Sequence, residues 1–120
     1  MKIAISSQGK DLNASVDSRF GRARCFLVLD TETNEVAVVD NASNADAMQA
    51  AGVQTAQAIA ARGVRAVLSG HVGPKAFTAL RAAGIDIYVG VAGTVRDAVE
   101  AFRAGKLTAS AAADVQGHWS

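Results

Sequence analysis

The sequence predicts an α/β domain in which short strands give way to amphipathic helices. Two observations indicate this class. Apolar runs of strand length occupy 2–6, 25–30, 35–40, 64–69 and 85–89. In the second half of the chain, apolar residues also recur every three or four positions over 53–62, 74–83 and 94–104, and a glycine follows each stretch. The predicted order is therefore β-β-β-α-β-α-β-α.

The first three strands are expected before any helix. A long loop from Ser7 to about Arg24 follows the first strand. The runs CFLVLD and EVAVVD flank the turn TETN, which predicts an antiparallel hairpin. The next stretch, NASNADAM at 41–48, is rich in Asn, Ser and Asp, which is typical of a loop.

The three helices carry start and stop signals. Gly63 is suited to end the first helix, Pro74 fits the first turn of the second, and Thr94 with Asp97 resembles a capping box at the third. The buried stripes are expected to be Val53, Ala56, Ile59 and Ala60, then Ala76, Phe77, Leu80 and Ala83, then Val95, Ala98, Val99 and Phe102.

The connections between elements select one sheet topology. Two consecutive β-α units favour right-handed crossovers and parallel strands. A five-stranded mixed sheet in the order 3-2-1-4-5, with strand 2 antiparallel, satisfies this rule and is the ribonuclease H-like arrangement. The connections after strands 1 and 4 then leave in opposite directions, which creates a crevice at the carboxyl ends of these strands. We expect loops 7–24, 70–73 and 90–93 to reach that crevice.

Composition and charge exclude several classes of protein. Half of the 120 residues are apolar, so residues 1–104 can form one domain, followed by a tail at 105–120. A net charge of +1 with both signs dispersed is not typical of a nucleic-acid binder. No apolar run reaches 18 residues, and no signal-peptide core is present, so no membrane association is predicted. The single cysteine excludes a disulfide framework, and we expect a cytoplasmic protein.

The stretch SGHVGPKAF, which begins at residue 69, is the first candidate for a ligand site. Gly70 and Gly73 would let a ligand approach the main chain, and the helix that starts at Pro74 offers amides that favour anions. It is not a P-loop, because Ala76 lies where a Mg²⁺-binding hydroxyl would be needed. A plain glycine-flanked turn is the alternative. His71 is either an incidental loop residue or a ligand contact.

A second candidate is the stretch SRFGRAR at 18–24, which contains three arginines and no acid. Arg19 and Arg22 flank a Phe-Gly pair, and two guanidinium groups beside a glycine suit an oxyanion. The alternative is a solvated basic loop in which Phe20 is a core anchor. A further glycine-rich turn, with Gly93 and Thr94, should face the same crevice.

Catalysis finds little support in the sequence. Nucleases with this topology need several acidic residues clustered around two metal ions, and one of these acidic residues lies on the first strand. The first predicted strand here, KIAIS, contains no acidic residue. Cys25 could be a soft ligand or a reactive thiol, but a lone cysteine among apolar residues is usually a core residue. We therefore expect a binding protein and not an enzyme.

Several separated motifs resemble the dinitrogenase iron–molybdenum cofactor biosynthesis family. They are MKIAIS, SRFGRARCFLVLD and the stretch from AGVQT to IYVG, and they span essentially residues 1–104 in the family's order. The resemblance implies a non-enzymatic carrier of an anionic metal–sulfur cluster on a ribonuclease H-like fold. The short form, without a cysteine- or histidine-rich tail, is similar to members associated with a molybdenum–copper sulfide cluster. Other relatives carry iron–molybdenum cofactor or its precursors.

The resemblance also implies a set of site residues. The family's motifs coincide with Ser18, Phe20, Gly21 and Arg22 in the first loop and with Gly70, Gly73 and Pro74 in the later turn. One cysteine cannot enclose a cluster, so binding would be mostly non-covalent. It would use Arg19, Arg22, helix-start amides, His71 as a candidate metal ligand, and apolar contacts from Phe20, Val72 and Met48. The alternative is a regulatory module that binds a phosphorylated metabolite or a partner protein in the same crevice, since relatives are associated with cell-division-type ATPases.

Overall fold

The computed structural model describes residues 1–45 and 51–111. Its elements are β1 (Lys2–Ser7), β2 (Cys25–Asp30), β3 (Val36–Asp40), α1 (Ala42–Ala45), α2 (Ala51–Ala60), β4 (Val64–Leu68), α3 (Pro74–Ala82), β5 (Asp86–Tyr88) and α4 (Val95–Arg103). The strands form one mixed sheet in the order β3-β2-β1-β4-β5. β2 is antiparallel to β1 and β3, whereas β1, β4 and β5 are parallel. The predicted α/β class, strand order and antiparallel second strand are confirmed.

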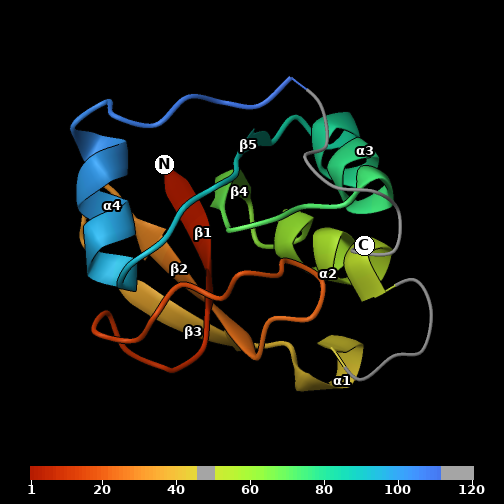
Figure 1. The fold of residues 1–120 in the computed structure, drawn as a ribbon, viewed down its shortest axis with the longest axis horizontal. Coiled ribbons are helices and arrows are strands. Elements are labelled where there is room, and N and C mark those ends of the chain that lie inside the picture. Colours follow the sequence, from red (N-terminus) through yellow and green to blue (C-terminus); the bar gives the residue numbers. More distant parts are fainter. Residues whose placement is uncertain (46–50, 112–120) are drawn as a thin grey trace.

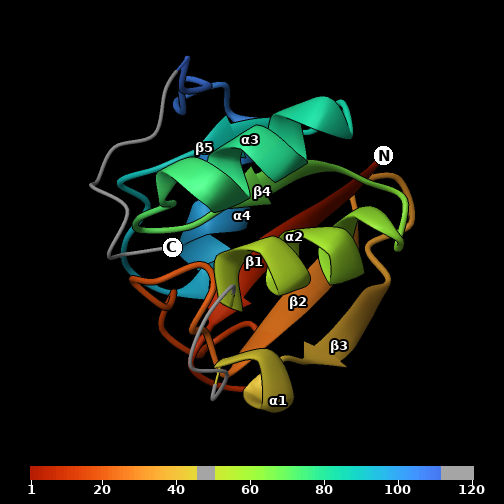
Figure 2. The same ribbon diagram turned by 90° about the vertical axis from the view of Figure 1, so that its right-hand side faces the viewer.

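Helices cover both faces of the sheet (Figures 1 and 2). α2 and α3 lie next to each other on one face, and α4 lies on the other. Because successive side chains of a strand point to opposite faces, the strands supply two core clusters. Phe26 and Val67 belong to the cluster under α2 and α3, whereas Leu27 and Leu68 belong to the cluster under α4.

The helix ends follow the predicted signals, but the buried stripes differ in part. The capping box at Thr94 and Asp97 is present, and Gly63 has the positive φ (74°) of a helix stop. Val53 and Ala60 in α2 and Phe102 in α4, which were predicted to be buried, are half-buried. Ala83, which was predicted to be buried, is exposed because α3 ends at Ala82.

A short helix replaces part of the loop predicted at 41–48. The carboxylate of Asp40 accepts a hydrogen bond of 2.9 Å from the amide of Ala42, an Asx turn that leads from β3 into α1. The Asn-, Ser- and Asp-rich pattern therefore marks a helix start as well as a turn. Met48, a predicted ligand contact, lies outside the described residues.

The chain continues to pack on the domain beyond the predicted boundary at residue 104. After α4 it runs back along the β5 side of the sheet toward α3 (Figure 1). Leu107 packs against the core under α4, and the amide of Ser110 donates a 2.7 Å hydrogen bond to the carbonyl of Ile87 in β5. Residues 112–120 of the predicted tail lie outside the described residues.

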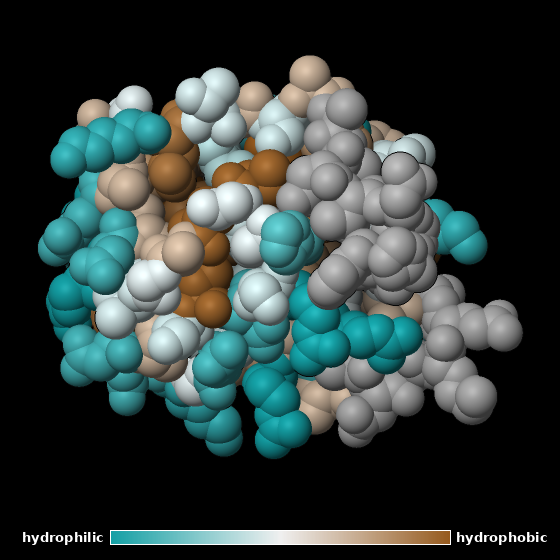
Figure 3. Space-filling model, viewed as in Figure 1, coloured by the Kyte–Doolittle hydropathy of each residue, from teal (hydrophilic) through white to brown (hydrophobic). Residues whose placement is uncertain are grey.

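The surface is mixed, with one apolar seam on the face shown in Figure 3. Hydrophobic residues form a vertical band left of the middle of this view, near α4. Hydrophilic residues lie along its left and lower margins. Elsewhere, edge strand β3 exposes Val36 and Val38. None of the helices formed by the described residues is long and apolar enough to cross a membrane.

Candidate functional site

The edge where the crevice was predicted is the one at which parallel strands β1 and β4 end. Their register pairs Ile5 with Leu68, so Ser6, near the end of β1, lies at the same level as Ser69, the residue after β4. Both serines are fully buried, and their hydroxyl oxygens lie 2.8 Å apart. The Ser6 hydroxyl also donates to the carbonyl of Asp17 at 2.8 Å, which fixes the long loop after β1 to the end of the sheet.

The two motifs singled out in the sequence lie against each other at this edge. Arg19 and His71 form a parallel β-bridge, and the amide of Phe20 donates a hydrogen bond of 3.1 Å to the carbonyl of His71. A Cβ atom added to Gly70 would lie only 2.7 Å from the Cα and the carbonyl oxygen of Ser18. Gly70 is therefore required by chain packing, not by the approach of a ligand.

A second contact fixes the other side of the arginine-containing loop, residues 19–24. A Cβ atom on Gly21 would lie 2.8 Å from the main chain of Gly52 in α2. The Gly21 carbonyl is also within hydrogen-bonding distance of two buried side chains, Thr55 Oγ1 at 3.2 Å and Asn41 Nδ2 at 3.3 Å. Sequence reasoning missed Asn41 and Thr55. A polar residue on the buried stripe of α2, as Thr55 is, was the signal that could have revealed this contact.

Phe20 and Val72 are core residues. Phe20 is 1% exposed and packs edge-on against Phe26, with ring centroids 5.2 Å apart, and Val72 is 0% exposed. The core-anchor alternative for Phe20 is thus the correct one. Both side chains hold their loops to the sheet, and neither offers apolar surface to a ligand in the crevice.

The start of α3, beside the arginine-containing loop, has two main-chain amides that no described residue accepts; Lys75 is exposed, whereas Ala76 is 1% exposed. Gly73 is the N-cap, and it has no side chain that could cap the helix. Pro74 has no N–H, and the amide of Phe77 already bonds to the Gly73 carbonyl at 2.9 Å. The amides of Lys75 and Ala76 donate to no acceptor among the described residues. Such amides, at the positive end of the helix dipole, favour an anion.

The start of α4 is closed by the protein itself. The amides of Val95 and Arg96 donate to carbonyls in the loop after β1, those of Ala14 and Leu12, each at 2.9 Å. The amide of Thr94 bonds to the Asp97 carboxylate at 3.2 Å. Gly93 and Thr94, predicted to face a ligand, instead complete a helix cap and a loop contact, because the loop after β1 takes up the donors that a ligand would need.

The basic side chains of the loop differ in their surroundings. Arg19 is exposed, and its guanidinium makes no hydrogen bond or ion pair within the described part of the chain. Arg22 and His71 are half-buried. Asp17 is buried, and its carboxylate accepts the amide of Arg19 at 3.0 Å, which shapes the turn that presents that arginine.

Cys25 is buried, which confirms the core prediction. Its Sγ lies 3.1 Å from the carbonyl oxygen of Gly9 and is placed to donate to it. Burial raises the pKa of the Cys25 thiol above its ordinary value, and the nearby Asp40 carboxylate adds to this effect. The residue borders a hollow of about 310 Å³ together with Lys10 and Arg24. A thiol in this state is neutral and a poor metal ligand at neutral pH.

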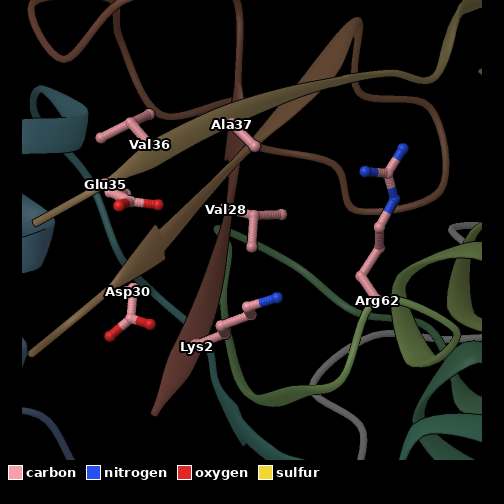
Figure 4. A pocket seen from close by; sticks show the side chains of 7 residues that line it. All are labelled: Lys2, Val28, Asp30, Glu35, Val36, Ala37 and Arg62. Carbon is pink, nitrogen blue, oxygen red and sulfur yellow. The ribbon is translucent and has the colours of Figure 1, made fainter. Parts of the chain in front are cut away.

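Another hollow, of about 160 Å³, lies at the opposite end of the sheet (Figure 4). Lys2, at the start of β1, and Asp30, at the end of β2, both line it. Figure 4 shows Asp30 and Glu35 on one side and Arg62 on the other. This hollow contains none of the predicted site residues.

The described residues contain no group of three or more His, Cys, Asp or Glu side chains that could hold a metal ion. Among the described residues, His71 therefore does not belong to a group of side chains that could form a metal site. What the geometry brings together is a basic loop, a half-buried histidine and two helix-start amides. This arrangement suits electrostatic and hydrogen-bonded capture of an anion.

The strand order and flanking helices define a small α/β domain of ribonuclease H-like topology. The chain belongs to the dinitrogenase iron–molybdenum cofactor family, whose model matches residues 1–105.

Similar proteins share nearly the whole chain. The apo form of the orange protein from Desulfovibrio gigas is 41% identical, with a TM-score of 0.93 over 95% of this chain and 96% of that one. A Thermotoga protein described as NifB-like is also 41% identical, with a TM-score of 0.79 over 90% and 91% of the two chains. An uncharacterized protein of Methanocaldococcus jannaschii is 29% identical over 110 residues, 89% of either chain.

Proposed function

We propose that this protein is a non-enzymatic carrier of an anionic metal–sulfur cluster of the molybdenum–copper sulfide type. The cluster is cargo, bound mostly without covalent bonds in the crevice at the carboxyl ends of β1 and β4. Membership of a cofactor family and the likeness to the orange protein support the class of cargo.

The observation that carries the proposal is the contrast between two helix starts at the same edge. The amides that open α4 are bonded to the loop after β1, whereas those of Lys75 and Ala76 in α3 find no acceptor among the described residues. The start of α3 lies next to the arginine-containing loop, because Arg19 and His71 are bridged. Donors and positive charge thus converge on one place, which suits a bulky anion.

Each group has a distinct part in binding. Lys75, which is exposed, donates its main-chain amide to a terminal sulfur or oxygen atom of the cargo. Arg19 and Arg22 neutralise its charge, and their planar guanidinium groups can bond two atoms at once. His71 supplies a hydrogen bond, or a metal bond when neutral. Because Arg19 is exposed, its attraction is screened by salt, and retention should weaken as ionic strength rises.

The direct test is reconstitution of the anaerobic apoprotein with tetrathiomolybdate and a copper salt. The mixture is passed through a desalting column, and the protein fraction is examined for charge-transfer absorption and for molybdenum and copper. Retained colour with both metals, decreasing at high salt, is expected. Absorption no greater than that of a protein-free control would contradict the proposal.

Iron–molybdenum cofactor precursors are the second candidate cargo, which the description of the matched family favours. They are also sulfur-rich anions and would use the same donors. Metal analysis of protein purified anaerobically from its native host separates the two, because iron without copper indicates a precursor. A cell-division-type ATPase partner stays a prediction, and co-purification of an ATPase would support it.

A further inference from the structure

A network of buried polar groups lies behind the arginine-containing loop. Asn41 is 2% exposed and Thr55 is 0% exposed, so both polar side chains have left water. Asn41 Nδ2 donates to the carbonyls of Gly21 at 3.3 Å and Ala23 at 2.9 Å. These two carbonyls belong to the residues on either side of Arg22. One side-chain amide therefore fixes the main chain immediately before and after that arginine.

Thr55 holds this amide in place. Its hydroxyl lies 3.1 Å from Asn41 Oδ1 and 3.2 Å from the Gly21 carbonyl, and its single proton can bond to either. Asn44 Nδ2 also donates to Asn41 Oδ1 at 3.2 Å. The network thus joins α1, α2 and the arginine-containing loop.

We propose that Asn41 and Thr55 are positioning residues that fix Arg22, and with it the arginine-containing loop, for binding an anion. This inference rests on the proposed function. The loop is tied to the sheet at Phe20 through the His71 carbonyl, and the carbonyls of Gly21 and Ala23 are held by this network. A guanidinium on a free loop must lose conformational freedom when it binds, whereas a fixed loop has already lost it in folding.

The geometry also explains why polar side chains lie between the arginine-containing loop and α2. Gly21 and Gly52 meet main chain to main chain, so no side chain fits between them. The Gly21 carbonyl faces α2 away from water and needs a donor from a neighbouring side chain. Thr55 and Asn41 satisfy it, and they fix one loop position where apolar packing alone would tolerate several.

The test compares Thr55→Val, which removes the hydroxyl at nearly constant shape, with Ile59→Val. Ile59 is 1% exposed in the same helix and belongs to the core cluster under α2 and α3, so the control weakens helix packing without touching the network. The first measurement is the rate at which trypsin cleaves the native protein after Arg22. Thr55→Val should speed this cleavage more than Ile59→Val does, when both are compared at equal global stability. Equal rates would overturn the proposal.

The second measurement is retention of tetrathiomolybdate by each variant, in the native background and in one carrying Arg19→Ala with Arg22→Ala. Thr55→Val should lower affinity about three- to tenfold in the native background, the range that one hydrogen bond is worth. It should have no further effect once the arginines are removed, because it acts through them. The same loss in both backgrounds would show a purely structural role and overturn the inference.

The two measurements separate this inference from the proposed function. If the native protein retains no tetrathiomolybdate while Thr55→Val still exposes the Arg22 bond to trypsin, the cargo proposal fails and the positioning of the loop stands. If the native protein retains the anion and Thr55→Val changes neither retention nor cleavage, the cargo proposal stands and the positioning role is rejected.

Discussion

The amide of Phe20 donates a hydrogen bond of 3.1 Å to the carbonyl of His71, and so joins the loop after β1 to the turn before α3. Phe20 follows β1 and His71 follows β4 in the sequence. The parallel pairing of these two strands brings the residues together. The relative position of the two loops therefore depends on close main-chain contact.

Replacing Gly70 tests that contact. In Gly70→Ala the new Cβ would lie 2.7 Å from the main chain of Ser18, so the arginine-containing loop must move. We expect a loss of about 1–3 kcal/mol in the free energy of unfolding and weaker anion retention. Gly90→Ala is the control, since Gly90, unlike Gly70, has a positive φ (71°) that strains an alanine, but has open space around its Cβ position. Urea unfolding should show both variants destabilised, and only Gly70→Ala should lose ligand.

The arginine pair should matter by position as well as by charge. Arg19→Ala with Arg22→Ala is expected to reduce retention of tetrathiomolybdate about tenfold or more, because hydrogen bonds to charged groups are worth about 1.5–3 kcal/mol each. Lys2→Ala with Lys106→Ala removes the same formal charge from exposed sites elsewhere. Equal losses in the two double variants, measured by equilibrium dialysis, would argue against the arginine-containing loop as the site.

The capping box should contribute to stability and not to binding. Thr94→Val removes the 3.1 Å bond from the Asp97 amide to the threonine hydroxyl. The expected cost is about 1 kcal/mol of stability with unchanged retention of the anion. A variant that unfolds normally but no longer retains ligand would place Thr94 in the site after all.

The buried thiol of Cys25 should make the free energy of unfolding depend on pH in the alkaline range. Burial raises the pKa of Cys25 in the folded protein, while in the unfolded chain the thiol ionises near its ordinary value of 9.0. The unfolded chain therefore loses this proton first, and stability should fall as the pH rises above about 9 and through the folded pKa. Cys25→Ala should lack this component, so the stabilities of the two proteins should converge at alkaline pH. Parallel urea-unfolding results from pH 7 to pH 10 would contradict this expectation.

The fold could be read from the sequence because its signals are local. Apolar runs, glycine stops, Pro74 and the capping box at Thr94 each act within a few residues. The handedness of β-α-β crossovers then leaves few sheet orders. The helix at Ala42 was missed because an N-cap and a turn use the same residue types.

The candidate site was harder to predict from the sequence, because it depends on contacts between segments that are far apart in the chain. Gly70 reads as a ligand-facing glycine until Ser18 is placed against it. The turn at Gly93 reads as an anion site until the loop after β1 is seen to occupy its amides. A polar Thr55 on a buried helix stripe indicates a buried partner, but the sequence does not say that this partner is Gly21, 34 positions away. Such pairings are set by tertiary contact, and no periodic pattern encodes them.

The pairing of Ile5 with Leu68 has a thermodynamic consequence for loading. The arginine-containing loop follows β1 and the start of α3 follows β4, so the proposed binding surface exists only when these strands are paired. A ligand that spans both therefore holds the whole domain together, and occupancy is linked to the global folding equilibrium. At a free ligand concentration of about 100 times Kd, the gain is about 2.7 kcal/mol. The melting temperature of the protein should thus report how much of it carries cargo.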